Sequence, residues 1–173
     1  MKNEIVVIIA LLGLPAMLVF GQHAPMPQRK EMREAEQYFN KPLSFVSVPC
    51  PEDSGRLSVL FHTGDQLFRI EAVDGGEGYL LSTRAMGRFD FFDYGVFYDD
   101  ELVVRGVLVT RYRSDHGAAI CQRKWLQQFN GYEGGPLTLG KDIDGVSGGT
   151  ISASSMLTDM QRCHLLVKTW LLH

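Results

Sequence analysis

The hydrophobic pattern at the C-terminal end of the chain predicts a long amphipathic helix. Apolar residues recur there at i, i+4 and i+7 spacing, which places them on one helix face and marks that face as core. A shorter helix is predicted over residues 29–39, where Met32, Ala35 and Phe39 interrupt a charged segment before a proline ends it. The residues of the C-terminal stripe are Met156, Met160, Cys163, Val167, Trp170 and Leu171.

The segment between these helices has the composition of short β-strands. Apolar runs of strand length are separated by turns rich in glycine and aspartate. A short helix over residues 121–129 and a glycine-rich loop over residues 130–150 follow the last strand. This order predicts one α+β domain with a mostly antiparallel sheet and flanking helices. The expected strands cover residues 57–61, 67–73, 79–83, 91–98 and 102–113.

The last predicted strand alternates with a period of two, which assigns its two faces. Three arginines mark the face that is expected to be exposed. The face predicted to be buried carries Leu102, Val104, Leu108 and Tyr112, and the opposite face carries Val103, Val107 and Val109.

The first residues of the chain form a separate unit. The apolar run at residues 5–20 is about 16 residues long, whereas a membrane-spanning helix needs about 20. Its length and position predict a secretory signal peptide over residues 1–21, cut before Gln22, with an uncleaved anchor as the alternative. Residues 22–28 then form a proline-rich tether and residues 29–173 the functional domain. We therefore expect an exported domain, either periplasmic or membrane-anchored and facing the periplasm.

The composition is that of an ordinary globular chain with a slight acidic excess. Of 173 residues, 45% are hydrophobic, and 17 Lys and Arg against 20 Asp and Glu give a net charge of −3. Nucleic-acid binding usually requires a basic excess, so this balance argues against a nucleic-acid partner. The chain is too short for separate dinucleotide and substrate domains. Its three cysteines cannot all pair within one molecule, and their spacing shows no metal signature.

Two catalytic patterns occur in the glycine-rich loop. Residues 135–142 have the spacing of a P-loop, but Asp142 stands where that loop needs a hydroxyl for magnesium, so we reject nucleotide hydrolysis. Residues 145–149 match G-x-S-x-G, which would make Ser147 the nucleophile of a small serine hydrolase. The residues before it make a poor central strand, so the hydrolase is only an alternative. Its candidate acids and bases are Asp159 and His164 downstream, or His62 and Asp93 upstream.

Residues 144–152 read DGVSGGTIS, and this string closely resembles the signature of the FMN-binding domain family. That family includes the C subunit of the sodium-pumping NADH:quinone reductase and the G subunit of the Rnf electron-transport complex. Thr150 matches the threonine that carries FMN through a phosphoester bond in the family. Gly149 stands where the family usually has alanine. The resemblance implies an FMN-binding flavoprotein that acts in electron transfer, with the FMN attached to Thr150.

A second block extends the resemblance towards the N-terminus. Residues 125–131 read WLQQFNG, which is similar to a family segment that ends in a W-x-x-Q-F-x-G-like pattern. Just before it, Asp-His-Gly at residues 115–117 replaces the Glu-Thr-Pro-Gly of the respiratory subunits. The similarity runs from residue 78 to residue 167. It implies a small exported relative in which residues 29–173 form the FMN-binding domain.

The resemblance also implies partners and a set of site residues. A separate flavin transferase would attach the FMN, using magnesium and FAD, and a membrane or periplasmic redox partner would exchange electrons with it. The chain shows no nicotinamide site of its own. A flavin-free binding domain of the same fold is the remaining alternative. The residues expected at the cofactor are Thr150, Asp144, Gly145, Ser147, Gly148, Gly149, Ser152, His116, Gly117 and Trp125.

General chemistry favours the same place for the cofactor. A phosphate prefers backbone N–H groups, small side chains and a helix N-terminus, and residues 147–155 supply glycines and hydroxyls just before the C-terminal helix. The flat isoalloxazine needs aromatic or aliphatic walls, for which Trp125, Phe129 and Tyr132 are candidates. His116 is a candidate donor to a flavin oxygen.

Overall fold

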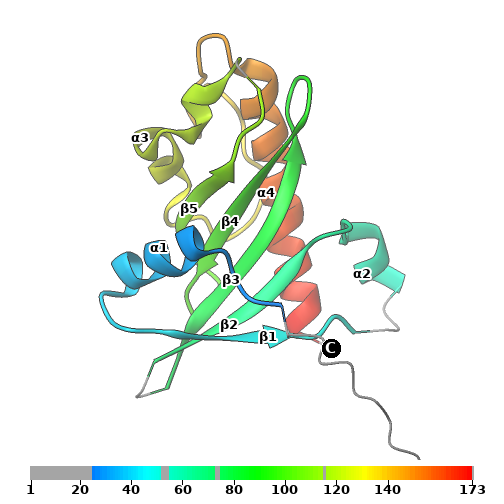
Figure 1. Cartoon of the computed structure of the whole chain (residues 1–173). Helices are drawn as coiled ribbons and strands as arrows, with labels where there is room; N and C mark the ends of the chain where they lie inside the picture. Colours follow the sequence, from blue (N-terminus) through cyan, green and yellow to red (C-terminus); the bar gives the residue numbers. More distant parts are fainter. Residues whose placement is uncertain (1–24, 52–54, 73–74, 115, 173) are drawn as a thin grey trace, which may run out of the picture.

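Five strands form one antiparallel sheet in the computed structural model, which describes residues 25–51, 55–72, 75–114 and 116–172. The strands lie side by side in sequence order, and each pairs antiparallel with its neighbours. This arrangement confirms the predicted α+β class (Figure 1). The strands are β1 (Ser44–Val48), β2 (Gln66–Ala72), β3 (Gly75–Met86), β4 (Phe91–Tyr98) and β5 (Val104–Arg111).

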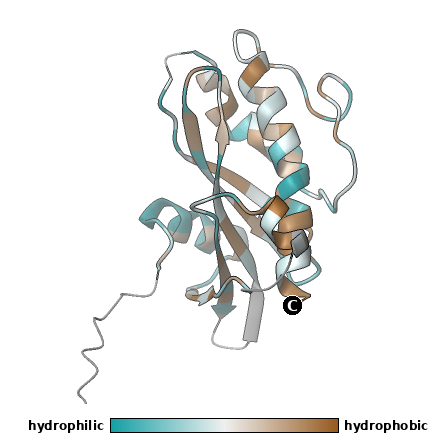
Figure 2. Ribbon diagram, turned by 90° about the vertical axis from the view of Figure 1, so that its right-hand side faces the viewer, coloured by the Kyte–Doolittle hydropathy of each residue, from teal (hydrophilic) through white to brown (hydrophobic). Residues whose placement is uncertain are grey.

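Two helices cover opposite faces of this sheet. Figures 1 and 2 show α4 (Thr150–Leu171) across one face and α1 (Arg29–Phe39) across the other. Tyr38 of α1 lies directly over Gly106 of β5, where a Cβ would come 2.0 Å from the Tyr38 ring, so only glycine allows this approach. In the described part of the chain the remaining elements are α2 (Gly55–Leu60), η1 (Ala118–Cys121), α3 (Arg123–Leu126) and η2 (Gln127–Phe129).

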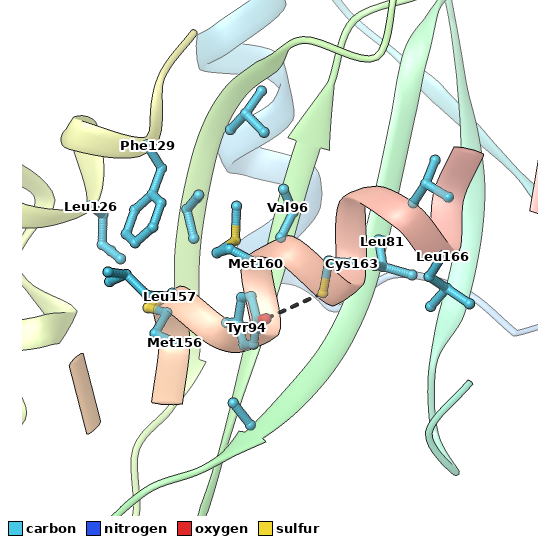
Figure 3. Close-up of a cluster of buried hydrophobic side chains, with 14 of the residues drawn as sticks. Leu81, Tyr94, Val96, Leu126, Phe129, Met156, Leu157, Met160, Cys163 and Leu166 are labelled. Carbon is cyan, nitrogen blue, oxygen red and sulfur yellow. Dashed lines mark hydrogen bonds between the residues drawn. The ribbon is translucent and has the colours of Figure 1, made fainter. Parts of the chain in front are cut away.

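The C-terminal helix is a core element, as its hydrophobic stripe predicts. The residues of that stripe are buried, except for Leu171, which is half-buried. Figure 3 shows the middle of α4 packed against Tyr94 and Val96 of β4. At the end of the helix the Trp170 indole donates to the Pro49 carbonyl at 2.9 Å, which joins α4 to the segment that follows β1. The helix is therefore packed on the sheet at its middle and bonded to the segment after β1 at its end.

A buried ion network also holds α4 to the sheet. Arg162 donates to Asp65 at 2.8 Å and to Asp159 at 2.6 Å. Thr83 of β3 donates to Asp65, and Tyr94 of β4 donates to Asp159. Buried charges are costly unless they are paired and hydrogen-bonded, and each carboxylate here has more than one donor. The network consequently fixes the rotation of α4 about its own axis, and with it the position of the first turn.

The predicted strand at residues 57–61 is wrong, because this segment forms the helix α2. Leu57 is buried whereas Val59 is 81% exposed. In a strand these two residues would point to the same face, so their different burial fits a helix. The turn expected after it, at residues 62–65, leads from this helix into β2, and in it the His62 N–H donates to the Asp65 carboxylate at 2.8 Å. The hydrophobic pattern also misses β1, whose residues are all half-buried or exposed and of which Phe45 and Val48 pack against the cores.

Two β-bulges reverse part of the face assignment of β5. Arg105 and Thr110 are extra residues relative to β4, and each extra residue turns the following side chains to the other face. Between the bulges the prediction is therefore wrong, since Leu108 packs towards α1 whereas Val107 and Val109 pack towards α4. Outside the bulges the assignment is confirmed for Leu102, Val104 and Tyr112, which pack in the α4 core.

The predicted signal segment, residues 1–21, lies outside the described residues, as does the first part of the tether at 22–28. In the part of the chain that the structure describes, no helix is long and apolar enough to cross a membrane. Directly before α1, the Gln28 N–H donates to the Glu31 carboxylate at 2.7 Å, which caps that helix. The three cysteines, all of them described, are free thiols. The boundaries at residues 21 and 28 stay predictions.

Candidate functional site

Two loops meet at the beginning of α4. One precedes η1 and contains His116 and Gly117, and the other, residues 142–149, leads into α4 (Figure 1). Their backbones touch at two glycines, because a Cβ on Gly149 would lie 3.1 Å from the Gly117 Cα and 3.0 Å from Val146 Cγ1. Gly117 has a φ of 82°, in the left-handed region that glycine adopts without strain. The close approach of the loops therefore depends on both glycines.

Side chains of the helical segment at residues 123–129 support the second loop. The Trp125 Nε1 donates to the Asp144 carbonyl at 2.8 Å, and the Asp144 N–H donates to Gln128 Oε1 at 2.8 Å. The backbone of Asp144 is thus bound on both sides. This places the residues that follow it, including the glycine-rich turn before α4.

Tyr112 joins the first loop to α4. Its hydroxyl donates to the His116 carbonyl at 2.6 Å and lies 3.0 Å from Ser152 Oγ in the first turn of the helix. Ser152 is buried. Its hydroxyl therefore serves a contact within the protein, whereas the neighbouring Thr150 is exposed.

A pocket of about 220 Å³ opens at this junction, with Thr150 in its wall. We call it the anchor pocket. Gly148 in its wall leaves open space, since no atom would lie within 4 Å of an added Cβ. The first N–H groups of an α-helix have no intrahelical partner, and the helix dipole adds positive potential there, so the pocket suits an anion. The anchor pocket is lined by Arg88, His116, Gly148, Gly149, Thr150, Ile151 and Ser152.

A second pocket of about 320 Å³ includes Trp125, Asp144 and Gly145 in its wall, and we call it the Trp125 pocket. Ser147 lies between the two pockets in sequence. It is exposed in a turn that is closed by the Gly149 N–H, which donates to the Val146 carbonyl at 3.0 Å. The ten residues predicted for the cofactor site are thus brought to one end of the fold, in two pockets and the loops that form them.

The structure adds three residues that the sequence pattern does not single out. Arg88 and Ile151 line the anchor pocket, and the Phe89 ring lies 5.9 Å from the His116 ring. Arg88 and Phe89 belong to the turn between β3 and β4, which the strand prediction leaves as a mere connection. An exposed Arg-Phe pair in a tight turn is the sequence signal that could have identified them.

The charged groups around the anchor pocket are of both signs. Arg88 lines the pocket itself. Arg113, near the base of the β3–β4 turn, pairs with Asp93, and this hydrogen bond raises the pKa of Arg113. Among the described residues, no group of three or more His, Cys, Asp or Glu is arranged to hold a metal ion. The anchor pocket itself, with Arg88 in its wall and the start of α4 beside it, suits an anion.

The structure does not assemble a serine hydrolase around Ser147. This residue lies in a turn, without the preceding strand that a nucleophile elbow needs. His164 lies about 21 Å along α4 from the start of the helix, and Asp159 about 14 Å. His62 is 3.9 Å from Asp159, and Asp93 accepts a hydrogen bond from an arginine. The candidate bases and acids therefore serve other parts of the fold.

The chain has a remote structural neighbour and no match in sequence. No protein-family model matches it, and no curated protein matches it. A crystal structure of NqrC from Shewanella oneidensis superposes on it with a TM-score of 0.46 and 16% sequence identity. The superposition covers 56% of this chain and 54% of that chain, so the chain matches about half the length of this neighbour.

Proposed function

We propose that this protein is an FMN-binding flavoprotein that acts in electron transfer, with the FMN joined through its phosphate to Thr150. The setting of Thr150 carries the proposal. Its exposed hydroxyl begins α4 and lines a pocket between two glycine-containing loops. It also matches the FMN-bearing threonine in the string at residues 144–152 that resembles the family signature.

The anchor pocket fits a phosphate. The first residues of α4 line it, their N–H groups have no partner within the helix, and a phosphate at a helix N-terminus is favoured by the helix dipole. Arg88 and His116 add side-chain donors at the same pocket. Gly148 leaves the space that a phosphate ester on the neighbouring Thr150 needs. These groups would hold the negative charge while Ser152, bonded to Tyr112, keeps the helix start in place.

Attachment of the flavin requires a partner, for which we propose a flavin transferase that uses FAD and magnesium. The Thr150 oxygen would attack the phosphorus on the FMN side of FAD. A new oxygen–phosphorus bond forms, the pyrophosphate bond breaks, the hydroxyl proton is lost and AMP leaves. The exposure of Thr150 and the small residues before it would give such an enzyme access.

The loop before Thr150 would serve as the recognition segment for the transferase. Asp144 and Gly145 are exposed. The backbone of Asp144 is held in one place by two hydrogen bonds, one donated by Trp125 and one accepted by Gln128. Ser147 is exposed in the turn that follows. A loop that is firmly held yet accessible suits recognition by an enzyme that must bring FAD to one hydroxyl.

When bound, FMN would supply the redox chemistry, and the chain would supply its position and tuning. Covalent attachment would retain the cofactor in an exported protein, where a dissociable FMN would be lost. We therefore propose that residues 1–21 direct the chain out of the cytoplasm. The redox partner would accordingly be a membrane or periplasmic protein.

Co-expression with a flavin transferase tests this proposal. Wild-type protein should keep its flavin fluorescence after denaturing gel electrophoresis, which covalently attached flavin survives. Thr150→Ala should lose the fluorescent band yet unfold like the wild type, because the side chain is exposed. Ser154→Ala changes another exposed hydroxyl, one turn further along α4 and outside the loop, and should be labelled normally. An unlabelled wild type, with a transferase active on a control substrate, would leave the flavin-free binding domain as the better interpretation.

A further inference from the structure

Large hydrophobic side chains lie exposed beside the first turns of α4. Exposed apolar residues are usually scattered singly, whereas a group of them marks a binding surface. The group comes from the ends of β3 and β4, the turn between them and the first turn of α4, which lie next to each other (Figure 1). Its members are Met86 (46% exposed), Phe89 (62%), Phe91 (46%) and Ile151 (54%).

The β3–β4 turn is held against α4. The Gly87 N–H donates to the Asp90 carbonyl at 2.8 Å, which closes the turn. A Cβ on Gly87 would lie only 3.4 Å from Ser152 Oγ, so the backbone of the turn lies against the first turn of the helix. The next two residues, Arg88 and Phe89, are therefore presented at a defined place beside the anchor pocket.

The Trp125 side chain offers little surface to a ligand. Only 6% of it is exposed, and its ring packs edge-on against Phe129 with the ring centroids 5.4 Å apart. Its N–H is bonded to the Asp144 carbonyl. Moreover, the Trp125 pocket and the anchor pocket have no lining residue in common among the described residues. A group attached to Thr150 therefore lies beside the β3–β4 turn rather than in the Trp125 pocket.

The anchor pocket is too small to enclose a flat ring system such as an isoalloxazine. Its volume of about 220 Å³ is below the about 300–1,000 Å³ of clefts that enclose drug-sized ligands. The pocket can take a phosphate and the start of the chain attached to it. At its rim, the Arg88 guanidinium lies 5.0 Å from the centre of the Phe89 ring, and His116 flanks the same ring.

We infer that Phe89 and Ile151 form the platform that receives the isoalloxazine of the FMN proposed on Thr150. This inference rests on the proposed function and adds the place of the ring, which is the protein surface beside the β3–β4 turn. Aromatic rings stack favourably at centroid distances of about 4.5–7 Å, and Phe89, which is 62% exposed, leaves side-chain surface for such stacking. A ring on this platform keeps its other face open to a redox partner.

Phe89→Trp tests the platform by fluorescence. An indole stacked on a flavin quenches its fluorescence, because the electron-rich indole reduces the excited ring. Transferase-labelled Phe89→Trp should therefore fluoresce several-fold less than the labelled wild type at equal flavin content. Val59→Trp is the matched control, since Val59 is exposed beside Leu165, about 22 Å along α4 from Thr150. It should leave the fluorescence unchanged.

Flavin content, measured by intact mass, separates the possible outcomes. Normal content with unquenched Phe89→Trp would overturn the platform and leave the proposed function standing. Brighter flavin in folded, labelled Trp125→Phe would place the ring at the Trp125 pocket and would also overturn the inference. An unlabelled wild type would overturn the proposed function, and the platform with it. Quenching by Phe89→Trp alone supports the inference.

Discussion

Replacing Gly149 by alanine tests the contact between the two loops of the site. A Cβ there would lie 3.0 Å from Val146 Cγ1, 3.1 Å from the Gly117 Cα and 3.4 Å from the Gly117 carbonyl oxygen. Favourable carbon–carbon contacts lie at about 3.5–4.0 Å, so either Val146 or the Gly117 backbone must move. Overpacking of this kind costs about 1–3 kcal/mol, and we expect the free energy of unfolding to fall by that amount.

Gly145→Ala is the matched control for this experiment. No atom would lie within 4 Å of a Cβ on Gly145, and its φ lies outside the left-handed region. Alanine at such a position stabilises by about 0.4–1 kcal/mol, because it restricts the unfolded chain. Urea unfolding followed by circular dichroism compares the two variants. In a Val146→Ala background, Gly149→Ala should cost less, since the nearest atom has been removed.

The stability and labelling of Gly149→Ala should respond differently. Thr150 stays exposed in this variant, and alanine is the residue that the resembled family usually has at this position, so the transferase should still label it. If Gly149→Ala is as stable as Gly145→Ala within about 0.5 kcal/mol, the loops do not touch and the reasoning about the junction is refuted.

Two further predictions concern α4. Trp170→Ala should lower the free energy of unfolding by about 3–5 kcal/mol, because Trp170 is only 4% exposed and its N–H donates to the Pro49 carbonyl. Leu172→Ala, at an exposed position, is the control. A loss below about 1 kcal/mol for Trp170→Ala would contradict the packing. Burial lowers the pKa of His164 in the folded state. As the pH is lowered below about 6.5, the unfolded chain therefore binds a proton at this residue before the folded chain does. The free energy of unfolding should fall over this range, until the pH is below the folded-state pKa as well. Urea unfolding at several pH values should show a shallower fall for His164→Gln, and identical profiles would argue against this assignment.

Hydrophobic patterns predict α1, α4 and β4 correctly. The stripe in α4 is buried as expected, and the predicted bounds of α1 and β4 coincide with those observed. The run at residues 57–61 is too short to show a period, and its helix is decided by tertiary packing of Leu57. The bulge at Arg105 reverses the predicted faces of β5 and the bulge at Thr110 restores them, and a bulge depends on pairing with β4, which the sequence does not reveal.

The difference between local patterns and the packing of distant segments also explains how much of the candidate site could be predicted. Residues 144–152 are consecutive, so a local motif places them together at the start of α4. The contact of Gly117 with Gly149 and the position of Phe89 depend on the packing of segments far apart in sequence. No periodicity within one segment reports such a contact. The sequence therefore identifies the proposed attachment residue but not the β3–β4 turn beside it.

Peptide mass spectrometry of transferase-labelled wild-type protein tests the central claim most directly. We predict a peptide that carries FMN, with fragmentation that assigns the adduct to Thr150 and leaves three nearby hydroxyls, those of Ser147, Ser152 and Ser154, unmodified. An adduct on one of these serines, with Thr150 unmodified, would contradict the assignment. The absence of any adduct, with a transferase that labels a control substrate, would contradict covalent attachment altogether.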